Sequence, residues 1–257
     1  MALLVGTSGW QYRDWRGVLY PEGLPQREWL ARYAANFATV EVNNAFYRLP
    51  ERSTFERWRE QTPDGFVVVV KVSRYLTHVR RLAEPAEPVA RLTERAAGLG
   101  PRLGPYLLQL PPTLRAEPER LDACLRAFPA GARVAVEPRH ESWWTGEVRR
   151  VLERRGSALS WADRAGRPLT PLWCTADWGY VRLHEGRAAP APSYGRSALG
   201  TWLERIDAAW PGVGDDVFVF FNNDHGGAAV RNARTLVRMA ANRALPTYTT
   251  ARAAGAR

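Results

Sequence analysis

Hydrophobic runs and amphipathic segments alternate along this chain. Eight short runs rich in β-branched and aromatic residues are typical of strands, and seven intervening segments carry apolar residues at helical spacing. The strand runs, such as VVVVKV and VFVFF, are continuously apolar, as expected for strands covered on both faces. The predicted strands are Leu3–Thr7, Thr39–Val42, Phe66–Val72, Tyr106–Leu110, Ala132–Val136, Ala158–Trp161, Gly179–Leu183 and Val217–Phe221. The predicted helices are Gln26–Asn36, Ser53–Glu60, Pro88–Leu99, Pro118–Ala127, Glu147–Glu153, Ser197–Trp210 and Ala228–Asn242, and Arg164–Asp177 has no clear helix.

This alternation predicts the fold class. Strands that alternate with helices pair in parallel through right-handed crossovers. Eight such units in 257 residues predict an α/β protein, a single (β/α)8 TIM-type barrel with parallel strands that forms one domain over residues 1–257. The alternative is an open doubly wound sheet, but its glycine fingerprint is missing after the first strand, over Gly6–Trp10.

Polar residues gather where the predicted strands end, and this is the end at which barrels of this type carry their active sites. All four histidines, His78, His140, His184 and His225, fall at or just after a strand end. Histidine titrates near neutral pH and is a common metal ligand. We expect at least one of the four to have a chemical role, the alternative being that all are structural.

Two glutamates, Glu41 and Glu137, lie inside apolar strand runs. A buried carboxylate must be paired, hydrogen-bonded or protonated, and Lys71 and Arg182 are the natural partners. One interpretation is a set of structural ion pairs inside the barrel. The other is a catalytic cluster in which a glutamate is the general base, while Lys71 holds an anionic oxygen, acts as an acid or forms a Schiff base with a carbonyl substrate.

The use of basic residues is uneven. Lys71 is the one lysine among 36 basic residues, so the chain uses arginine wherever a positive surface charge suffices. Because an ammonium group is compact and can lose its proton when buried, this exception favours a functional role for Lys71 over chance survival. The net charge of +10 is scattered along the chain, which fits compositional drift or attraction to nucleic acid or acidic metabolites.

Two further features have a functional and a structural interpretation. The run Asn222–Gly227 opens the last predicted helix, so it could bind phosphate or could form only a turn and helix cap. Large aromatic side chains cluster after the first, second and fifth strands, where they could stack on a sugar or base or could plug the barrel. They are Trp10, Tyr12, Trp15, Tyr20, Phe46, Tyr47, Trp143 and Trp144.

The sequence says less about cofactors and cellular location than about the fold. The Glu and His residues could bind a divalent metal, but no H-x-x-x-H or comparable spacing is present, so we assign no metal. Cys124 and Cys174 are expected to be reduced thiols. The apolar runs are too short to span a bilayer, and the first ten residues are not typical of a signal peptide. We therefore expect a cytoplasmic protein with no membrane association and leave its oligomeric state open.

Seven ordered motifs extend along nearly the whole chain. They are Gly6–Trp10 with Tyr12, Trp15 and Tyr20-Pro21; Val40–Asn43 with Phe46–Pro50; Lys71 with Thr77-His78 and Arg81-Leu82; Leu103–Pro105 with Gln109–Pro112; Glu137–His140 with Ser142-Trp143; Tyr180–His184; and Phe221–Asp224. Together these motifs resemble the DUF72 (YecE-like) family. One departure is Glu185, where the family pattern leads us to expect glycine; here the glycine follows at 186. The resemblance implies a TIM barrel and no particular reaction.

The leading hypothesis is an enzyme, of hydrolase or lyase/isomerase type, with acid–base or hydrolytic chemistry on a small polar or anionic substrate. The alternatives are a nucleic-acid-binding or processing protein, which would use the basic surface and loop aromatics, and a non-catalytic ligand-binding barrel. The catalytic candidates are Glu41, Lys71, Glu137, His140 and His184. The substrate-binding candidates are Trp10, Asn43, Tyr47, His78, Gln109, Arg139, Trp143, Arg182, Asn222, Asn223 and Asp224.

Overall fold

The computed structural model describes residues 2–188, 192–212, 216–243, 245 and 247. Within them the strands are β1 (Ala2–Thr7), β2 (Thr39–Val42), β3 (Val67–Lys71), β4 (Leu103–Gln109), β5 (Val134–Glu137), β6 (Ala158–Leu159), β7 (Trp161–Arg164), β8 (Arg167–Pro168), β9 (Gly179–Leu183) and β10 (Asp216–Phe221). The helices are α1 (Trp29–Ala34), α2 (Asn44–Tyr47), α3 (Arg52–Glu60), α4 (Ala86–Ala96), α5 (Pro118–Arg126), α6 (Gly146–Arg154), α7 (Arg196–Ala209) and α8 (Ala228–Asn242). None of these helices is long and apolar enough to cross a membrane.

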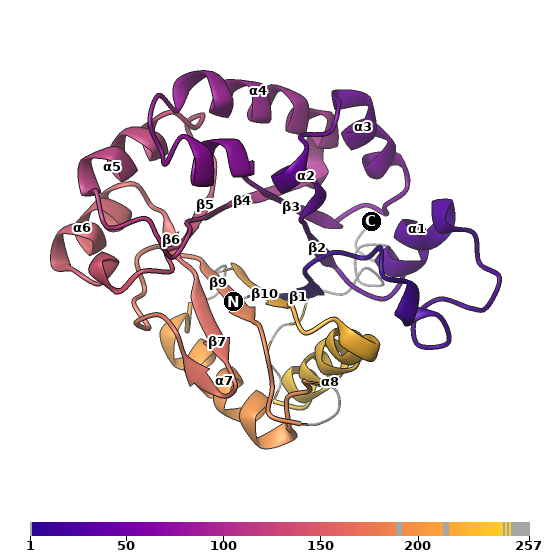
Figure 1. Cartoon of the computed structure of the whole chain (residues 1–257). Helices are drawn as coiled ribbons and strands as arrows, with labels where there is room; N and C mark the ends of the chain where they lie inside the picture. Colours follow the sequence, from indigo (N-terminus) through magenta and orange to yellow (C-terminus); the bar gives the residue numbers. More distant parts are fainter. Residues whose placement is uncertain (1, 189–191, 213–215, 244, 246, 248–257) are drawn as a thin grey trace.

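The strands form two five-stranded sheets. One has the order β1-β10-β9-β7-β8 and the other the order β2-β3-β4-β5-β6. All neighbours are parallel except β7 and β8, which form a short antiparallel pair. The predicted α/β class with parallel strands is confirmed. Closure into a single barrel is not confirmed, because the hydrogen-bonded strands of the described residues form two separate sheets (Figure 1).

The chain itself passes from one sheet to the other at Ser160. A single strand was predicted over Ala158–Trp161, and this prediction was wrong. Its first half is β6, which pairs with β5, whereas β7 begins at Trp161 and pairs with β9. Between them the Ser160 N–H donates to the Val136 carbonyl at 2.8 Å, so the backbone stays bonded through the change of sheet. The segment that follows contains β8 and no helix, as predicted.

The two sheets also meet where β1 lies beside β2. One backbone bridge, between Ser8 and Glu41, joins these strands among the described residues. A Cβ at Gly6 would clash with the Thr39 carbonyl, so glycine permits this approach. The hydroxyl of the buried Tyr33, on α1, accepts from the Thr7 N–H at 2.8 Å and donates to the Thr39 carbonyl at 3.0 Å. It therefore replaces a strand-to-strand hydrogen bond.

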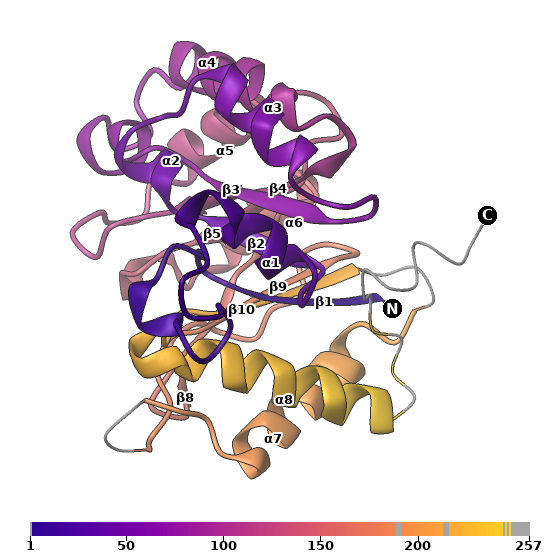
Figure 2. The same ribbon diagram turned by 90° about the vertical axis from the view of Figure 1, so that its right-hand side faces the viewer.

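The helices cover the outer faces of the sheets and leave a second core between them. In Figures 1 and 2, α4 to α6 lie outside the β2–β6 sheet, and α7 and α8 lie outside the other sheet. A separate buried cluster fills the interior with residues of both sheets: Leu4, Val69, Leu107, Ala135, Ala158, Trp178, Tyr180, Phe218 and Phe220. The two sheets thus face each other across an apolar core, and polar residues lie beyond it at the carboxyl ends of the strands.

The predicted helices are confirmed within a few residues. Gln26–Asn36 begins instead as a short 3-10 turn before α1, and the helix predicted to reach Leu99 ends earlier, at Ala96, where a 3-10 segment continues the chain. Several short elements were not predicted, and two of them follow strands of the β2–β6 sheet. These are α2, directly after β2, and a π-helical turn over Tyr75–Val79, after β3. Both lie at the carboxyl ends of strands. The two cysteines are free, Cys124 buried and Cys174 exposed.

Replacement of Tyr33 with phenylalanine tests the contact between β1 and β2. Tyr33→Phe leaves one buried N–H and one buried carbonyl without this partner, so we expect the free energy of unfolding to fall by about 2–3 kcal/mol in urea titrations. Tyr106→Phe is the matched control, because Tyr106 is also buried but its hydroxyl bonds no described residue, and it should lose less than about 1 kcal/mol. Equal losses in both variants would contradict a bridging role for Tyr33.

Candidate functional site

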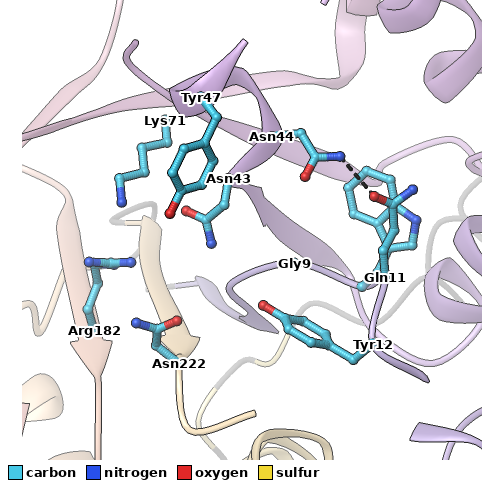
Figure 3. Close-up of a pocket in the computed structure, with 10 residues that line it drawn as sticks. Gly9, Gln11, Tyr12, Asn43, Asn44, Tyr47, Lys71, Arg182 and Asn222 are labelled. Atoms are coloured by element: carbon cyan, nitrogen blue, oxygen red, sulfur yellow. Dashed lines mark hydrogen bonds between the residues drawn. The ribbon is translucent and has the colours of Figure 1, made fainter. Parts of the chain in front are cut away.

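A polar pocket of about 420 Å³ opens at the carboxyl ends of the central strands (Figure 3). Its walls come from the segment after β1, from β2–α2, from the last residue of β3, from β9 and from the end of β10. Both sheets therefore contribute to it, and Figure 3 shows the polar ends of Lys71, Arg182 and Asn222 directed toward a shared space. The lining residues are Gly9, Trp10, Gln11, Tyr12, Asn43, Asn44, Tyr47, Lys71, Arg182 and Asn222.

A larger hollow of about 760 Å³ lies at the opposite end of the strands. Its walls are mainly apolar or backbone, for example at Leu4, Val67 and Phe218. Its charged residues, Arg133 and Asp216, already pair with each other at 2.6 Å. The convergent polar groups that a reaction needs are in the smaller pocket, which we take as the candidate site.

Arg182 forms the floor of the pocket and ties the two sheets together. It is on β9, yet both of its carboxylate partners belong to the other sheet. Its Nε and Nη2 donate to the two oxygens of Glu41 at 2.9 and 2.8 Å, and its Nη1 donates to Glu137 Oε2 at 2.6 Å. Tyr180, two residues earlier on the same strand face, donates to Glu41 Oε2 at 2.6 Å. All four side chains are buried.

Arg139 and His184 complete the surroundings of Glu137. Arg139 Nη2 and Nε lie 2.6 and 2.8 Å from Glu137 Oε1. His184 Nε2 lies 3.4 Å from the same oxygen, and Asn222 Nδ2 lies 3.0 Å from His184 Nδ1. An amide N–H that donates to Nδ1 places the ring proton on Nε2, facing Glu137. Burial lowers the pKa of His184 although Glu137 opposes this, so the ring is neutral at pH 7.

The carboxylates are held in their charged form. Burial alone would raise the pKa of Glu41, but the charges of Arg182 and Lys71 and the hydrogen bonds from Tyr180 and Arg182 lower it. Burial would likewise raise the pKa of Glu137, but Arg182, His184 and Arg139 surround this carboxylate and hold its pKa well below the usual range. Carboxylates in this state are weak bases.

Lys71 is the exception in this network. It is the last residue of β3 and is 9% exposed. Its Nζ lies 4.3 Å from the centre of the Phe46 ring, and among the described residues no carboxylate lies within ion-pair distance of it. Burial and the nearby charge of Arg182 lower the pKa of Lys71 to about 8, although Glu41 and Glu137 oppose the shift.

Several buried oxygen atoms in and next to the pocket lining have no hydrogen-bond partner among the described residues. Asn43 Nδ2 and the Tyr12 hydroxyl both donate to the Ser8 carbonyl, at 3.2 and 2.6 Å. Asn43 Oδ1, Ser8 Oγ and Asp224 Oδ1 are buried and have no hydrogen-bond partner among the described residues. Burial and the charge of Glu41 raise the pKa of Asp224 to about 7, although contact with Tyr12 opposes this. Of these three residues only Asn43 lines the pocket, so its Oδ1 is the acceptor nearest to a ligand there.

The comparison with known proteins identifies the family. A family model described as "Protein of unknown function DUF72" matches residues 4–254. This chain belongs to the DUF72 family. The resemblance drawn from the seven motifs is thus confirmed.

Two curated proteins are similar to this chain in sequence, and two solved structures are similar to it in fold. The UPF0759 protein YecE of Escherichia coli (strain K12) is 32% identical over 156 residues, 59% of this chain and 54% of YecE, so the match spans about half of that relative. The UPF0759 protein YunF of Bacillus subtilis (strain 168) is 24% identical over 270 residues, 92% of this chain and 94% of YunF. A DUF72 family crystal structure from Thermotoga maritima MSB8 has a TM-score of 0.82 at 29% identity, over 93% of this chain and 99% of that one. Another, from Enterococcus faecalis V583, has a TM-score of 0.77 at 19% identity, over 92% and 94% of the two chains, and shares the fold.

Within this DUF72 chain, several sequence candidates lie together at one pocket. Trp10, Asn43, Tyr47, Lys71, Arg182 and Asn222 line the pocket. Glu41, Glu137, Arg139 and His184 lie directly behind Arg182 and Asn222. The predicted pairing of both glutamates with Arg182 is present. Lys71 was the other expected partner, and it lies near the glutamates without an ion pair to either.

Other candidates have structural contacts instead. The ring of the buried Trp143 donates to the Leu114 carbonyl, and His140 caps a 3-10 turn by accepting from the Ser142 N–H. Asn223 donates to the Pro192 carbonyl and to Asn232, which holds the loop after β9. Gln109 donates to the Leu110 carbonyl, and His78 contacts Thr77 and the edge of the Phe46 ring. None of these five lines the pocket.

The loop aromatics are mostly core residues. Trp15, Tyr20 and Trp143 are at most 1% exposed, so they plug the structure and offer no face for stacking. Tyr12 and Trp144 are half-buried, and Tyr47, at the pocket rim, is 81% exposed. For a metal, the described residues provide no group of three or more His, Cys, Asp or Glu side chains placed to hold an ion.

Sequence reasoning did not assign several residues in and around the pocket. Tyr180, which bonds Glu41 behind the pocket, could have been found, because it lies two positions before Arg182 and therefore on the same face of β9. The place of Asn44 in the pocket lining, and the contact of the loop aromatic Phe46 with Lys71, could not be predicted, because both residues lie on α2, whose four residues are too few for a periodic pattern. Asn44 Nδ2 donates to Gln11 Oε1 at 2.8 Å, which joins the segments after β1 and β2 at the pocket rim.

Removal of Arg182 tests the network behind the pocket. Arg182→Met leaves two buried carboxylates without their shared cation, so we expect the free energy of unfolding to fall by about 3–5 kcal/mol. Arg149→Met is the control, since Arg149 pairs with Glu153 at 2.8 Å in a half-exposed pair on α6, and it should lose less than about 1 kcal/mol. Denaturant unfolding at pH 7 measures both, and a loss below 1 kcal/mol for Arg182→Met would contradict the network.

Proposed function

We propose that this DUF72 protein is an enzyme that acts on a small anionic substrate held at Lys71. One observation carries the proposal: among the described residues, Lys71 has no carboxylate of its own in the charge network beside the pocket. Arg182 and Arg139 offset Glu41 and Glu137, and this leaves the Lys71 ammonium without a carboxylate in ion-pair contact among the described residues. An unpaired buried cation facing a cavity favours the binding of an anion.

The pocket suits a small polar molecule. A volume of about 420 Å³ lies at the lower end of the range typical of ligand sites. The amides of Asn43, Asn44 and Asn222 line the pocket, and each NH2 group has a second N–H beyond the hydrogen bond that it already makes. The unpaired Asn43 oxygen supplies an acceptor. These groups together favour a substrate that carries a negative charge and at least one hydroxyl group.

The acid–base role falls to Lys71 rather than to the glutamates. Glu41 and Glu137 have no oxygen free of hydrogen bonds, and their lowered pKa values make them poor bases. Lys71, with a pKa of about 8, can exchange a proton near neutral pH. Asp224, whose pKa is raised to about 7, is a second candidate proton carrier, next to Tyr12. The glutamates then act as positioning residues that fix Arg182.

The barrel interpretation of the fold supports this location of the site. The interior cluster draws on both sheets, the chain passes between them at Ser160, and Ser8 bridges to Glu41 at the other junction. These features favour two halves of a (β/α)8-type barrel, in which reactions occur at the carboxyl ends of the strands.

The nucleic-acid alternative is less well supported. It relied on the net charge of +10 and on the loop aromatics, but Trp15, Tyr20 and Trp143 are buried and cannot stack on bases. A ligand-binding barrel without turnover remains the distinct alternative, and it would bind the same anions without ever converting one.

Anion titration tests the proposal. We expect oxalate, malonate or inorganic phosphate to bind in calorimetric titrations at pH 7, and Lys71→Met to weaken that binding at least about tenfold, because one charge-assisted contact is worth about 1.5–3 kcal/mol. Arg231→Met is the control for general charge, because Arg231 is exposed on α8, and it should leave the affinity unchanged.

The pH dependence of the same titration has a definite sign. The Lys71 amine loses its proton as the pH rises through about 8, so anion affinity should be largest below pH 8 and should fall between pH 8 and 9.5. Affinity that is equal in the protein and in Lys71→Met, or that does not change over this range, would contradict anion binding at Lys71.

A further inference from the structure

The amine of Lys71 has the surroundings of a nucleophile. Both oxygens of Glu41 are engaged by Arg182 and Tyr180, and both oxygens of Glu137 are engaged by Arg182 and Arg139. The carboxylates that could hold the ammonium form of Lys71 are therefore already bonded to other donors. One side of Nζ is covered by the Phe46 ring at 4.3 Å, and the other side lines the pocket.

We propose that Lys71 is a covalent site at which a carbonyl substrate carrying one carboxylate or phosphate forms a Schiff base. This inference rests on the proposed function, because it concerns the same pocket and the same class of anion. It adds the reacting group of the substrate, an aldehyde or ketone, and the atom that it reacts with, Lys71 Nζ.

The choice of residue type supports covalent chemistry. The chain uses arginine for every basic residue except this one, and Arg182 already provides a permanent positive charge in the pocket. An arginine at position 71 could bind an anion at least as well through its planar fork. A guanidinium cannot be deprotonated in proteins, whereas a primary amine can lose a proton and attack a carbonyl carbon. Lysine is thus required for the reaction and not for the charge.

The environment makes the attacking form accessible. Only a neutral amine has a lone pair, and burial beside the positive Arg182 favours loss of the proton. With a pKa of about 8, roughly a tenth of Lys71 is neutral at pH 7, whereas an ordinary lysine is neutral in well under a thousandth of molecules. The burial of Lys71 and the charge of Arg182 therefore both favour the neutral amine.

The step is balanced without any co-reactant. The neutral amine of Lys71 attacks the carbonyl carbon and forms a carbinolamine, in which the former carbonyl oxygen is a hydroxyl. That oxygen leaves as water with both protons of the amine, and a carbon–nitrogen double bond forms. The imine nitrogen then takes up one proton from solvent, equivalent to the proton that the ammonium form released before the attack. With this protonated imine, the charges of Lys71, Arg139, Arg182, Glu41 and Glu137 sum to a net +1, which the single negative charge of the substrate offsets.

Reductive trapping tests the inference, and the chain suits it because its only amines are Lys71 and the chain terminus. The probe is glyoxylate, the smallest aldehyde with a carboxylate, with cyanoborohydride as the hydride donor at pH 7. Arg231→Lys places an ordinary exposed amine on α8 as an internal reference. We expect peptide mapping to find the carboxymethyl group on Lys71 at least about tenfold faster than at position 231. Acetaldehyde, which lacks the charge, should show a smaller preference for Lys71.

Modification of Lys71 no faster than of position 231 would overturn the inference. In that case the anion titrations show whether only the covalent step is wrong or whether the proposed function is wrong as well. If anions bind and Lys71→Met weakens their binding, the covalent step is wrong and the proposed function stands. If neither trapping nor anion binding depends on Lys71, both are wrong.

Discussion

The bridge from Arg182 to Glu41 and Glu137 is the interaction on which the rest of this structure depends. Burying three charges in an interior is unfavourable unless each is paired and hydrogen-bonded. Here every nitrogen of the guanidinium donates to a carboxylate, and Tyr180 donates to Glu41 as well. Because Arg182 belongs to one sheet and both glutamates to the other, the bridge joins the sheets above the apolar interior core. It also forms the floor of the pocket.

That bridge determines the state of Lys71. An amine beside two glutamates would ordinarily be held as an ammonium ion, but here the oxygens of both are occupied by better-placed donors. Burial and the Arg182 charge then outweigh the attraction of the glutamates, and the pKa of Lys71 falls to about 8. The same arrangement that stabilises the fold thus leaves one amine available for binding or reaction.

Much of this could be predicted from residue patterns. The strand runs placed Glu41, Lys71, Glu137 and Arg182 at strand ends because a continuous apolar run defines its own boundaries. The division of Ala158–Trp161 between two sheets could not be predicted, since a local residue pattern does not show which strands the two halves of the run pair with. Trp143 and His140 were misplaced because an aromatic or a histidine at a strand end has the same sequence signal whether it points into a pocket or into the core. The occupied state of the glutamates depends on distances between strands, which no local pattern contains.

The most direct test of this account is the titration of the Lys71 amine itself. In protein labelled with 13C-lysine, the side-chain carbons beside the amine come from a single residue, so their chemical shift against pH reports one group. The account predicts a midpoint near 8. A midpoint near that of an exposed lysine, about 10.4, would show that the ammonium is stabilised as usual and would contradict the central role assigned to Lys71.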